Sequence, residues 1–417
     1  NSRISLSNND SGTSNTVFGS KSGANLASGG NYNVLIGEDA GNDLTTGTNN
    51  IAIGFGALDR CTSHALRNIA IGLYSMHGSW TSNAVVDCVA VGEQTLNGAL
   101  ESTASGCTGV GSFALTALTT GAGNVAVGFE AGKALTTQNY NTFIGHEAGE
   151  AVAGTSNTAL GYRALADSSA DVDYCVAIGH NALTSADADY DSGSVAIGHQ
   201  SLQNQSATAL AGNTAIGHQS GAAITTAARN LAVGYQSLDA LTQGDDNIAI
   251  GLDAMGALST TDVSDKNIAI GNYAMDGVSS LAATENVFIG YDSGGGSWTG
   301  TLSQKNVAIG NSTMTGAMND ADENTAVGYA ALNALTTGDL NTAIGHQAGL
   351  VFTTGFGNVF LGHNAGMATV DADKCTIIGY RAAAGGNMAA GAGDGTGADG
   401  TVAVGNQALY SLTSGSG

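Results

Sequence analysis

Six of the eight histidines of this chain stand at one position of a recurring motif, directly after a glycine. Tyr and Phe often fill the same position, and His180, His199 and His218 come from three successive copies. A row of imidazoles could bind a transition metal, particularly where several chains meet on a symmetry axis. Coordination requires ligands that converge on one point, which a linear row within one chain does not supply. A stacked stripe of rings is therefore the favoured interpretation, and a metal site at these three histidines is the weaker hypothesis.

Carboxylates gather in the longer segments between motifs, where a calcium ion could bridge them. The groups are Asp171 with Asp173, Asp187 with Asp189 and Asp191, Asp245 with Asp246, Asp320 with Asp322 and Glu323, and Asp371 with Asp373. Calcium-binding β-repeats need stacked copies of a glycine–aspartate turn, and only one weak copy is present, at residues 395–399. We therefore interpret the groups as solvated turns and predict no cofactor.

The two tryptophans occupy equivalent positions, which indicates one role used twice. Trp80 and Trp298 each stand eight residues after a motif glycine, within Gly-Ser-Trp-Thr, in copies that span 20 residues. Extra residues in a short repeat usually bulge from one face, and an exposed indole offers an apolar surface to a sugar ring or a neighbouring subunit. The alternative is an indole folded back over a corner of its own coil. We take Trp80 and Trp298 as candidate binding residues.

Signals for catalysis are missing from the sequence. It contains no Gly-x-Ser-x-Gly elbow, no phosphate-binding loop and no His-Glu-x-x-His motif, so we predict that the protein is not an enzyme. The net charge of −23, from 34 acidic and 11 basic residues, disfavours nucleic acid and anionic membranes as partners, since phosphate binding needs clustered Lys and Arg. No stretch approaches the roughly 18 consecutive apolar residues of a membrane-spanning helix, so we expect no membrane insertion.

The motif that positions these residues reads Asn, β-branched, Ala, aliphatic, Gly, as in residues 50–54 and 267–271. Successive motif glycines lie 16 to 20 residues apart, except for a last step of 26. The 22 glycines are at positions 19, 37, 54, 72, 92, 111, 128, 145, 161, 179, 198, 217, 234, 251, 271, 290, 310, 328, 345, 362, 379 and 405. We predict a single repeat domain over residues 1–417, with an N-terminal strand or cap at 1–14, repeats at 15–410 and a Gly- and Ala-rich insertion at 384–401.

This period predicts an all-β fold, a β-solenoid or β-roll of about 22 coils with 16 to 20 residues per coil. Helix-pair repeats need about 33 residues or more, and alternation of apolar residues at every second position is typical of strands. We expect each coil to contain a strand, a corner, a second short strand and a turn. With strands about 4.8 Å apart, the coils would form a rod on the order of 100 Å long. The absence of proline fits, since proline would remove a ladder hydrogen bond.

The position four residues before the glycine carries Asn in 16 of 22 copies. One carboxamide every ~4.8 Å can donate to the next carboxamide oxygen, so we predict a structural ladder. Its members are Asn15, Asn33, Asn50, Asn68, Asn124, Asn141, Asn157, Asn213, Asn230, Asn247, Asn267, Asn286, Asn306, Asn324, Asn341 and Asn358. Cys88, Cys107, Cys175 and Cys375 replace Asn in this column, and with Cys61 we interpret them as buried free thiols. Cys88 and Cys107 lie on successive coils, slightly too far apart for an unstrained disulfide.

The run Asn-x-Ala-Ile-Gly, with a small residue three places after Gly, resembles the head repeats of trimeric autotransporter adhesins. Residues 213–221 and 341–349, which read Asn-Thr-Ala-Ile-Gly-His-Gln-Ser/Ala-Gly, and the opening segment 2–15 resemble tail-fibre and tail-spike repeats of tailed bacteriophages. The resemblance covers residues 15 to about 410. It implies a trimeric β-roll, with three chains around one axis.

The expected function is therefore the structural or adhesive shaft of an extracellular or viral fibre that presents surface-binding loops to a host. The expected partners are further copies of the chain and a cell-surface glycan or other surface receptor, and the expected location is extracellular or on the virion surface. The first alternative is a structural filament in which single solenoids stack end to end. A less favoured alternative is a binder of an ordered surface such as ice, which would need a regular Thr-x-Thr array that the sequence lacks.

Overall fold

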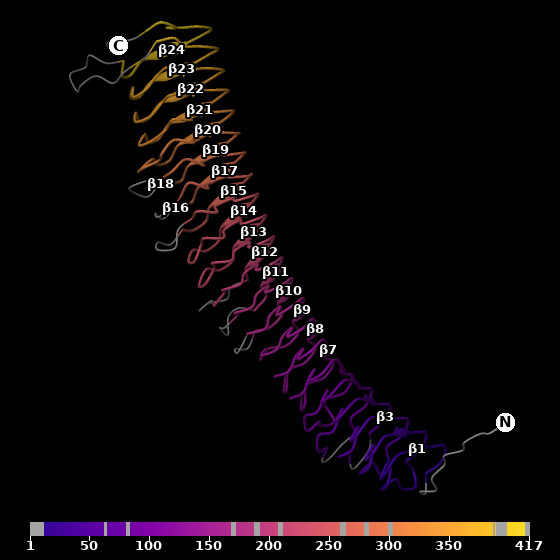
Figure 1. Cartoon of the computed structure of the whole chain (residues 1–417). Coiled ribbons are helices and arrows are strands. Elements are labelled where there is room, and N and C mark those ends of the chain that lie inside the picture. Colours follow the sequence, from indigo (N-terminus) through magenta and orange to yellow (C-terminus); the bar gives the residue numbers. More distant parts are fainter. Residues whose placement is uncertain are drawn as a thin grey trace, which may run out of the picture. The chain divides into compact units, whose positions relative to one another are not determined.

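The computed structural model describes residues 12–61, 65–80, 84–167, 172–186, 192–206, 212–258, 264–278, 283–298, 303–386, 388 and 398–412. The chain divides into two compact units, Asn1–Leu210 and Ala211–Gly417. Both units consist of stacked coils with parallel strands, and their described residues contain no helix (Figure 1). The chain is thus an all-β solenoid, as the repeats predict. Most of the predicted N-terminal strand or cap and of the Gly- and Ala-rich insertion lies outside the described residues.

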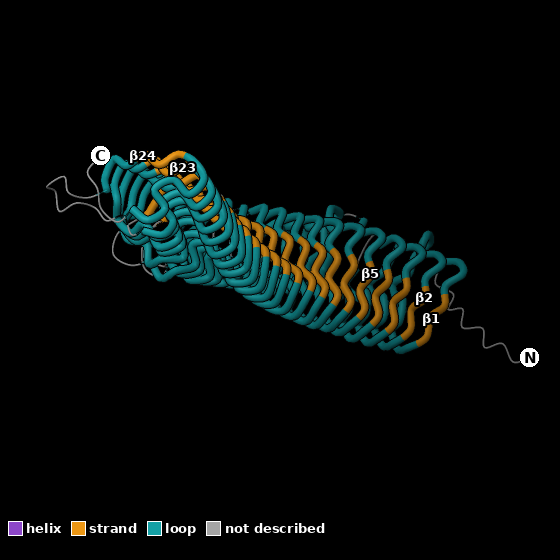
Figure 2. The backbone as a smooth tube through the Cα atoms, turned by 90° about the horizontal axis from the view of Figure 1, so that it is seen from above, coloured by secondary structure: helices purple, strands orange, loops and turns teal. Residues whose placement is uncertain are grey.

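In the first unit, each coil contributes one three-residue strand that pairs in parallel with the strand of the next coil. The strands are β1 (Thr16–Phe18), β2 (Val34–Ile36), β3 (Ile51–Ile53), β4 (Ile69–Ile71), β5 (Val89–Val91), β6 (Thr108–Val110), β7 (Val125–Val127), β8 (Thr142–Ile144), β9 (Thr158–Leu160), β10 (Val176–Ile178) and β11 (Val195–Ile197). In Figure 2 these strands lie side by side as one sheet of the unit.

The second unit repeats the arrangement. Its strands are β12 (Thr214–Ile216), β13 (Leu231–Val233), β14 (Ile248–Ile250), β15 (Ile268–Ile270), β17 (Val287–Ile289), β19 (Val307–Ile309), β20 (Thr325–Val327), β21 (Thr342–Ile344), β22 (Val359–Leu361), β23 (Thr376–Ile378) and β24 (Val402–Val404). Two further strands, β16 (Ala283–Thr284) and β18 (Ser303–Gln304), pair with each other in a second small sheet.

The strands stack in register, so equivalent residues form straight columns. Ala249 of β14, for example, lies opposite Ala232 of β13 and Ala269 of β15. The middle residue of every strand is buried, whereas the two flanking residues are half-buried or exposed. The Ala column therefore faces the interior, and the β-branched and aliphatic columns face outward.

The chain turns sharply after each strand. The motif glycine Gly251 has φ +144°, and a Cβ there would come within 2.5 Å of the carbonyl oxygen of Gly271 in the next coil. Residues two and four places after the glycine, such as Asp253 and Met255, have φ near +50°. A left-handed residue cannot continue a strand. The second short strand expected at this point is therefore wrong, and turns stand in its place.

In most coils the interior holds one large side chain at one of two positions. Where the strand centre is Ala, the fourth residue after the motif glycine is usually a buried Leu or Met, as in the pair Ala269 and Met275. Where the strand centre is Phe288, that fourth residue is Gly294, and a Cβ there would come within 2.5 Å of the Phe288 ring. Phe143 with Gly149 and Phe360 with Gly366 repeat the exchange. A large side chain thus stands at one of the two positions or at neither, as in the coil with Ala126 and Gly132, but never at both.

Candidate functional site

The Asn column forms the predicted ladder. Asn247 Nδ2 donates to Asn230 Oδ1 over 3.0 Å and to the carbonyl of Ser264 over 2.7 Å, and Asn247 Oδ1 accepts from the backbone and side-chain N–H groups of Asn267. Fifteen of the 16 carboxamides are buried, and Asn15 is half-buried. Because each carboxamide joins its own coil to both neighbours, the ladder is a structural element and leaves little polar capacity for a ligand.

Cys88 and Cys107, which replace Asn in this column, make a hydrogen bond that the asparagines also make. All five cysteines are buried, and each is a thiol that is not part of a disulfide. Cys88 Sγ donates to the carbonyl of Ala104 over 3.2 Å and Cys107 Sγ to that of Gly121 over 3.3 Å, which is the bond that Asn Nδ2 makes in other coils. A hydrogen bond with Cys107, together with burial, raises the pKa of the Cys88 thiol. Both groups therefore act as small buried donors.

A second polar column, six residues before the glycine, was missed in the sequence. Its Asp and Asn side chains accept the backbone N–H of the equivalent residue one coil earlier; Asp265 Oδ1, for example, accepts from Asp245 over 2.7 Å. The members with this bond are Asn31, Asn139, Asp173, Asp245, Asp265, Asp322, Asp339, Asp373 and Asp399. Several acids interpreted as solvated turns thus hold the backbone together. Asp171, Asp187, Asp189 and Asp191 lie outside the described residues.

The column directly after the glycine is the predicted stripe of stacked rings. In the first unit His180 and His199 stack with ring centroids 5.1 Å apart and planes 21° apart. In the second unit His218 stacks on Tyr235 at 4.9 Å, and His346 stacks on His363 at 4.8 Å with planes only 6° apart. Near-parallel rings direct their nitrogen atoms side by side and not toward a common point. This geometry does not support the weaker hypothesis of a metal site at His180, His199 and His218.

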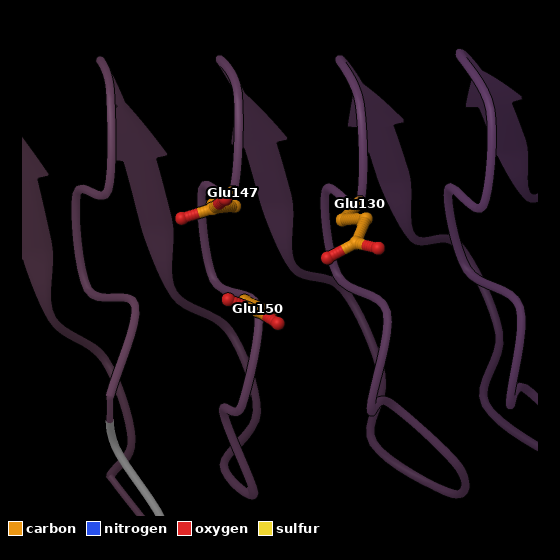
Figure 3. Close-up of side chains that lie close together, drawn as sticks. All are labelled: Glu130, Glu147 and Glu150. Carbon is orange, nitrogen blue, oxygen red and sulfur yellow. The ribbon is translucent and has the colours of Figure 1, made fainter.

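Among the described residues, one group of three carboxylates brings its oxygens within 4.8 Å of one another: Glu130, Glu147 and Glu150 (Figure 3). Two cations already lie against it. Lys133 Nζ is 3.0 Å from Glu130 Oε2 and 3.6 Å from Glu150 Oε1, and Arg163 Nη1 is 3.3 Å from Glu147 Oε2. The ammonium group of Lys133 therefore takes the place that a divalent cation would need.

Replacing Lys133 with Gln is expected to turn this group into a weak calcium site, because three carboxylates would then face one another without their ammonium partner. Millimolar calcium should raise the melting temperature of the variant by a few degrees and leave the unaltered protein unchanged. Lys21→Gln is the matched control, since Lys21 lies 4.0 Å from the single carboxylate of Asp39. An equal response of both variants to calcium would contradict this assignment.

Both tryptophans are buried, so the hypothesis of exposed binding platforms is wrong for Trp80 and Trp298. Each is only 2% exposed. Trp298 Nε1 donates to the carbonyl of Gly294 over 3.0 Å, and its ring meets Phe288 edge-on with centroids 5.6 Å apart. The extra length of these coils lets the indole fold inward, where it fills the corner.

The pKa of several carboxylates at the corners is raised by burial. Burial, with a contribution from the charge of Asp253, raises the pKa of Asp239 to about 6. Burial likewise raises the pKa of Asp276 and Asp292. In the first unit, His77 Nε2 lies 3.5 Å from Asp59 Oδ2, and burial raises the pKa of Asp59 and lowers that of His77. In the second unit burial is the main cause of the raised pKa values, and repulsion from Asp253 is a smaller cause at Asp239 and Asp276.

The outward residues of the three-residue strands carry no charge in either unit, and their alternation in the sequence does not by itself reveal that they form a surface. The residues one and three places before the motif glycines number 44, of which 36 are apolar and 8 are Thr. Ile144, Leu160 and Ile344 on this face are 39%, 44% and 41% exposed. We call these two columns the sheet face. An uncharged and largely apolar surface of this kind is suited to binding another flat surface.

The chain matches no protein-family model, no curated protein and no solved structure. Within the part of the chain that the structure describes, no helix is long and apolar enough to span a membrane.

Proposed function

We propose that the protein is the structural shaft of an extracellular or viral fibre, in which copies of the chain associate through the sheet face. The observation that carries the proposal is the complete absence of charge from this face in a chain whose net charge is −23. Charged residues are kept to the corners and turns, where Arg67 pairs with Asp87 and Lys305 with Glu323. This distribution supports a face that is covered in the working assembly.

The size of the face favours association. Eleven coils at about 4.8 Å each give every unit a face roughly 50 Å long. Monomeric proteins rarely expose contiguous apolar patches beyond about 300–600 Å², and burial is worth about 25 cal/mol per Å² of apolar surface. A flat, regular array of Val, Ile and Thr fits best against the same array in another copy, because both have the same strand spacing.

A homotrimer is the arrangement that the resemblance of the repeats implies, and a single such face on a unit suits closed association around an axis. Repetition of a coil is an economical way to build a long shaft, since each added coil brings its own core and ladder contacts. With both indoles buried, attachment to a glycan or other surface receptor is assigned to the segments that connect the coils.

Replacing Ile344 with Glu is expected to dissociate the assembly, because the charge would be buried against another copy. We expect the dissociation constant to rise roughly 30-fold or more, equivalent to about 2 kcal/mol. Val351→Glu is the matched control: Val351 belongs to the same coil and is 39% exposed against 41% for Ile344, but lies outside the sheet face. Molecular mass in solution measures the effect. An unaltered protein that is monomeric at high concentration, or an equal effect of both variants, would refute the proposal.

A further inference from the structure

We call the histidines that directly follow the motif glycines the histidine column. We propose that protonation of the histidine column weakens the association of chains through the sheet face, so that assembly depends on pH. This inference rests on the proposed function. The column follows the sheet face after a single motif glycine, so its rings lie along one edge of that face. Any charge that the rings gain is therefore placed at the rim of the proposed interface.

The stacking holds the rings of this column close together. In the second unit the rings of Tyr329, His346, His363 and Tyr380 follow one another with centroids 5.2, 4.8 and 5.4 Å apart. Neutral rings at this distance stack favourably, whereas two imidazolium cations held face to face repel each other. Imidazole is the side chain that ordinarily changes charge between pH 8 and pH 5.

Few groups near this pair could compensate a positive charge. Strands β20 to β23, each of which ends two residues before one of the four rings, contain no titratable residue. From each motif glycine to the fifth residue after it, these four coils contain no carboxylate, and Arg381 is the one charged residue. Arg381 donates to the Tyr410 hydroxyl over 2.7 Å and adds a further positive charge on this side. The acids of these coils, such as Asp339 and Asp373, precede the strands.

The first unit contains an equivalent pair. His180 and His199 stack on each other, with Tyr162 as the next ring at 5.0 Å from His180. The charged residue next to Tyr162 in the chain is Arg163, which already pairs with Glu147 and Asp167. His146 differs, because its Nδ1 lies 3.4 Å from Glu147 Oε1. We therefore assign the pH response to the two His–His pairs and not to His146.

The same column borders the sheet face in every copy of the chain. When copies associate, the rim of the sheet face loses contact with water, and this loss disfavours the charged form of an imidazole. Protonation thus opposes the burial of the sheet face in the assembly without altering the inward Ala and Asn columns.

The test compares the dissociation constant of the full chain, from sedimentation equilibrium, at about pH 7.5 and about pH 5. We expect it to increase at least about tenfold at the lower pH. The variant His180→Tyr/His199→Tyr/His346→Tyr/His363→Tyr should lose most of this increase, since Tyr occupies the same column in other coils and stays neutral in this range. A second variant with Gln at the four positions should lose the same increase. It shows that the effect comes from removing the imidazoles and not from introducing Tyr rings.

Asp239→Asn is the control, because Asp239, with its pKa raised to about 6, titrates over the same range but lies outside the histidine column. It should keep the full response to pH. Assembly that is equally tight at both pH values, or an equal response of the Tyr variant and the unaltered protein, would overturn the inference while leaving the proposed function intact. A chain that is monomeric at both pH values would overturn both.

Discussion

Replacing Asn247 with Asp is expected to lower the free energy of unfolding of the second unit by about 3–5 kcal/mol at neutral pH. The Nδ2 group of Asn247 donates to Asn230 Oδ1 and to the carbonyl of Ser264, over 3.0 and 2.7 Å. A carboxylate would point a negative oxygen at these two acceptors in a fully buried position. The bonds that Oδ1 accepts from Asn267 would remain, so the loss measures the two missing donors and the buried charge.

Urea unfolding followed by circular dichroism measures this effect, and Asn272→Asp is its control. Asn272 is exposed, and its Oδ1 accepts the N–H of Leu252 over 3.0 Å, a bond that a carboxylate keeps. The control should change stability by less than about 0.5 kcal/mol. The loss at Asn247→Asp should shrink as the pH falls, because a protonated carboxyl is neutral and regains one donor. Equal, small losses in both variants would show that the ladder contributes little.

The ladder could be predicted from the sequence because its geometry has only one solution. A polar residue repeated at the same position of coils about 4.8 Å apart must contact the equivalent residue of the next coil. Asn carries both a donor and an acceptor for that contact. The same logic correctly predicted the stacked rings. It would also have found the Asp and Asn column six residues before the glycine, had those acids been aligned by coil and not grouped by their position along the chain.

The orientation of the strand could not be read from hydropathy. Ile and Val are more apolar than Ala, yet the Ala column faces inward and the Ile and Val columns face outward. The coil is too narrow for a large side chain at both the strand centre and the turn, so Leu58, at the turn, fills the space beside Ala52. The aliphatic columns are therefore left on the surface, which hydropathy alone does not predict.

The tryptophans illustrate a related limit. Coil length indicates that extra residues are present, but it does not say whether they bulge outward or fold inward. The indole of Trp298 donates to the carbonyl of Gly294 and packs against the ring of Phe288. Both contacts depend on the backbone path through the turn. The exchange of Phe and Gly between strand centre and turn was present in the sequence, yet only the packing shows that the two positions share one space.

Exchanging the large side chain between those two positions is expected to be far less harmful than either half of the exchange. Phe288→Ala should cost about 3–5 kcal/mol, since it leaves a cavity in a fully buried position. Gly294→Met should also destabilise, because a Cβ there would come within 2.5 Å of Phe288 Cδ1 and 2.6 Å of Cε1. Together the two changes place one large side chain in the space that one large side chain occupied before.

The double variant Phe288→Ala/Gly294→Met should therefore lie within about 1–2 kcal/mol of the unaltered protein, with a coupling energy of at least about 2 kcal/mol. The neighbouring coils already carry Ala with Met275 and Ala with Met314, at φ +53° and +47°, so the turn accepts Met in the left-handed conformation. The other tryptophan coil combines Ala70 and Met76 with the buried Trp80, which shows that the indole does not require a Phe beside it. Urea unfolding of the four proteins gives the coupling energy directly. If the losses of the two single variants simply add, residues 288 and 294 do not fill the same space, and the proposed exchange is wrong.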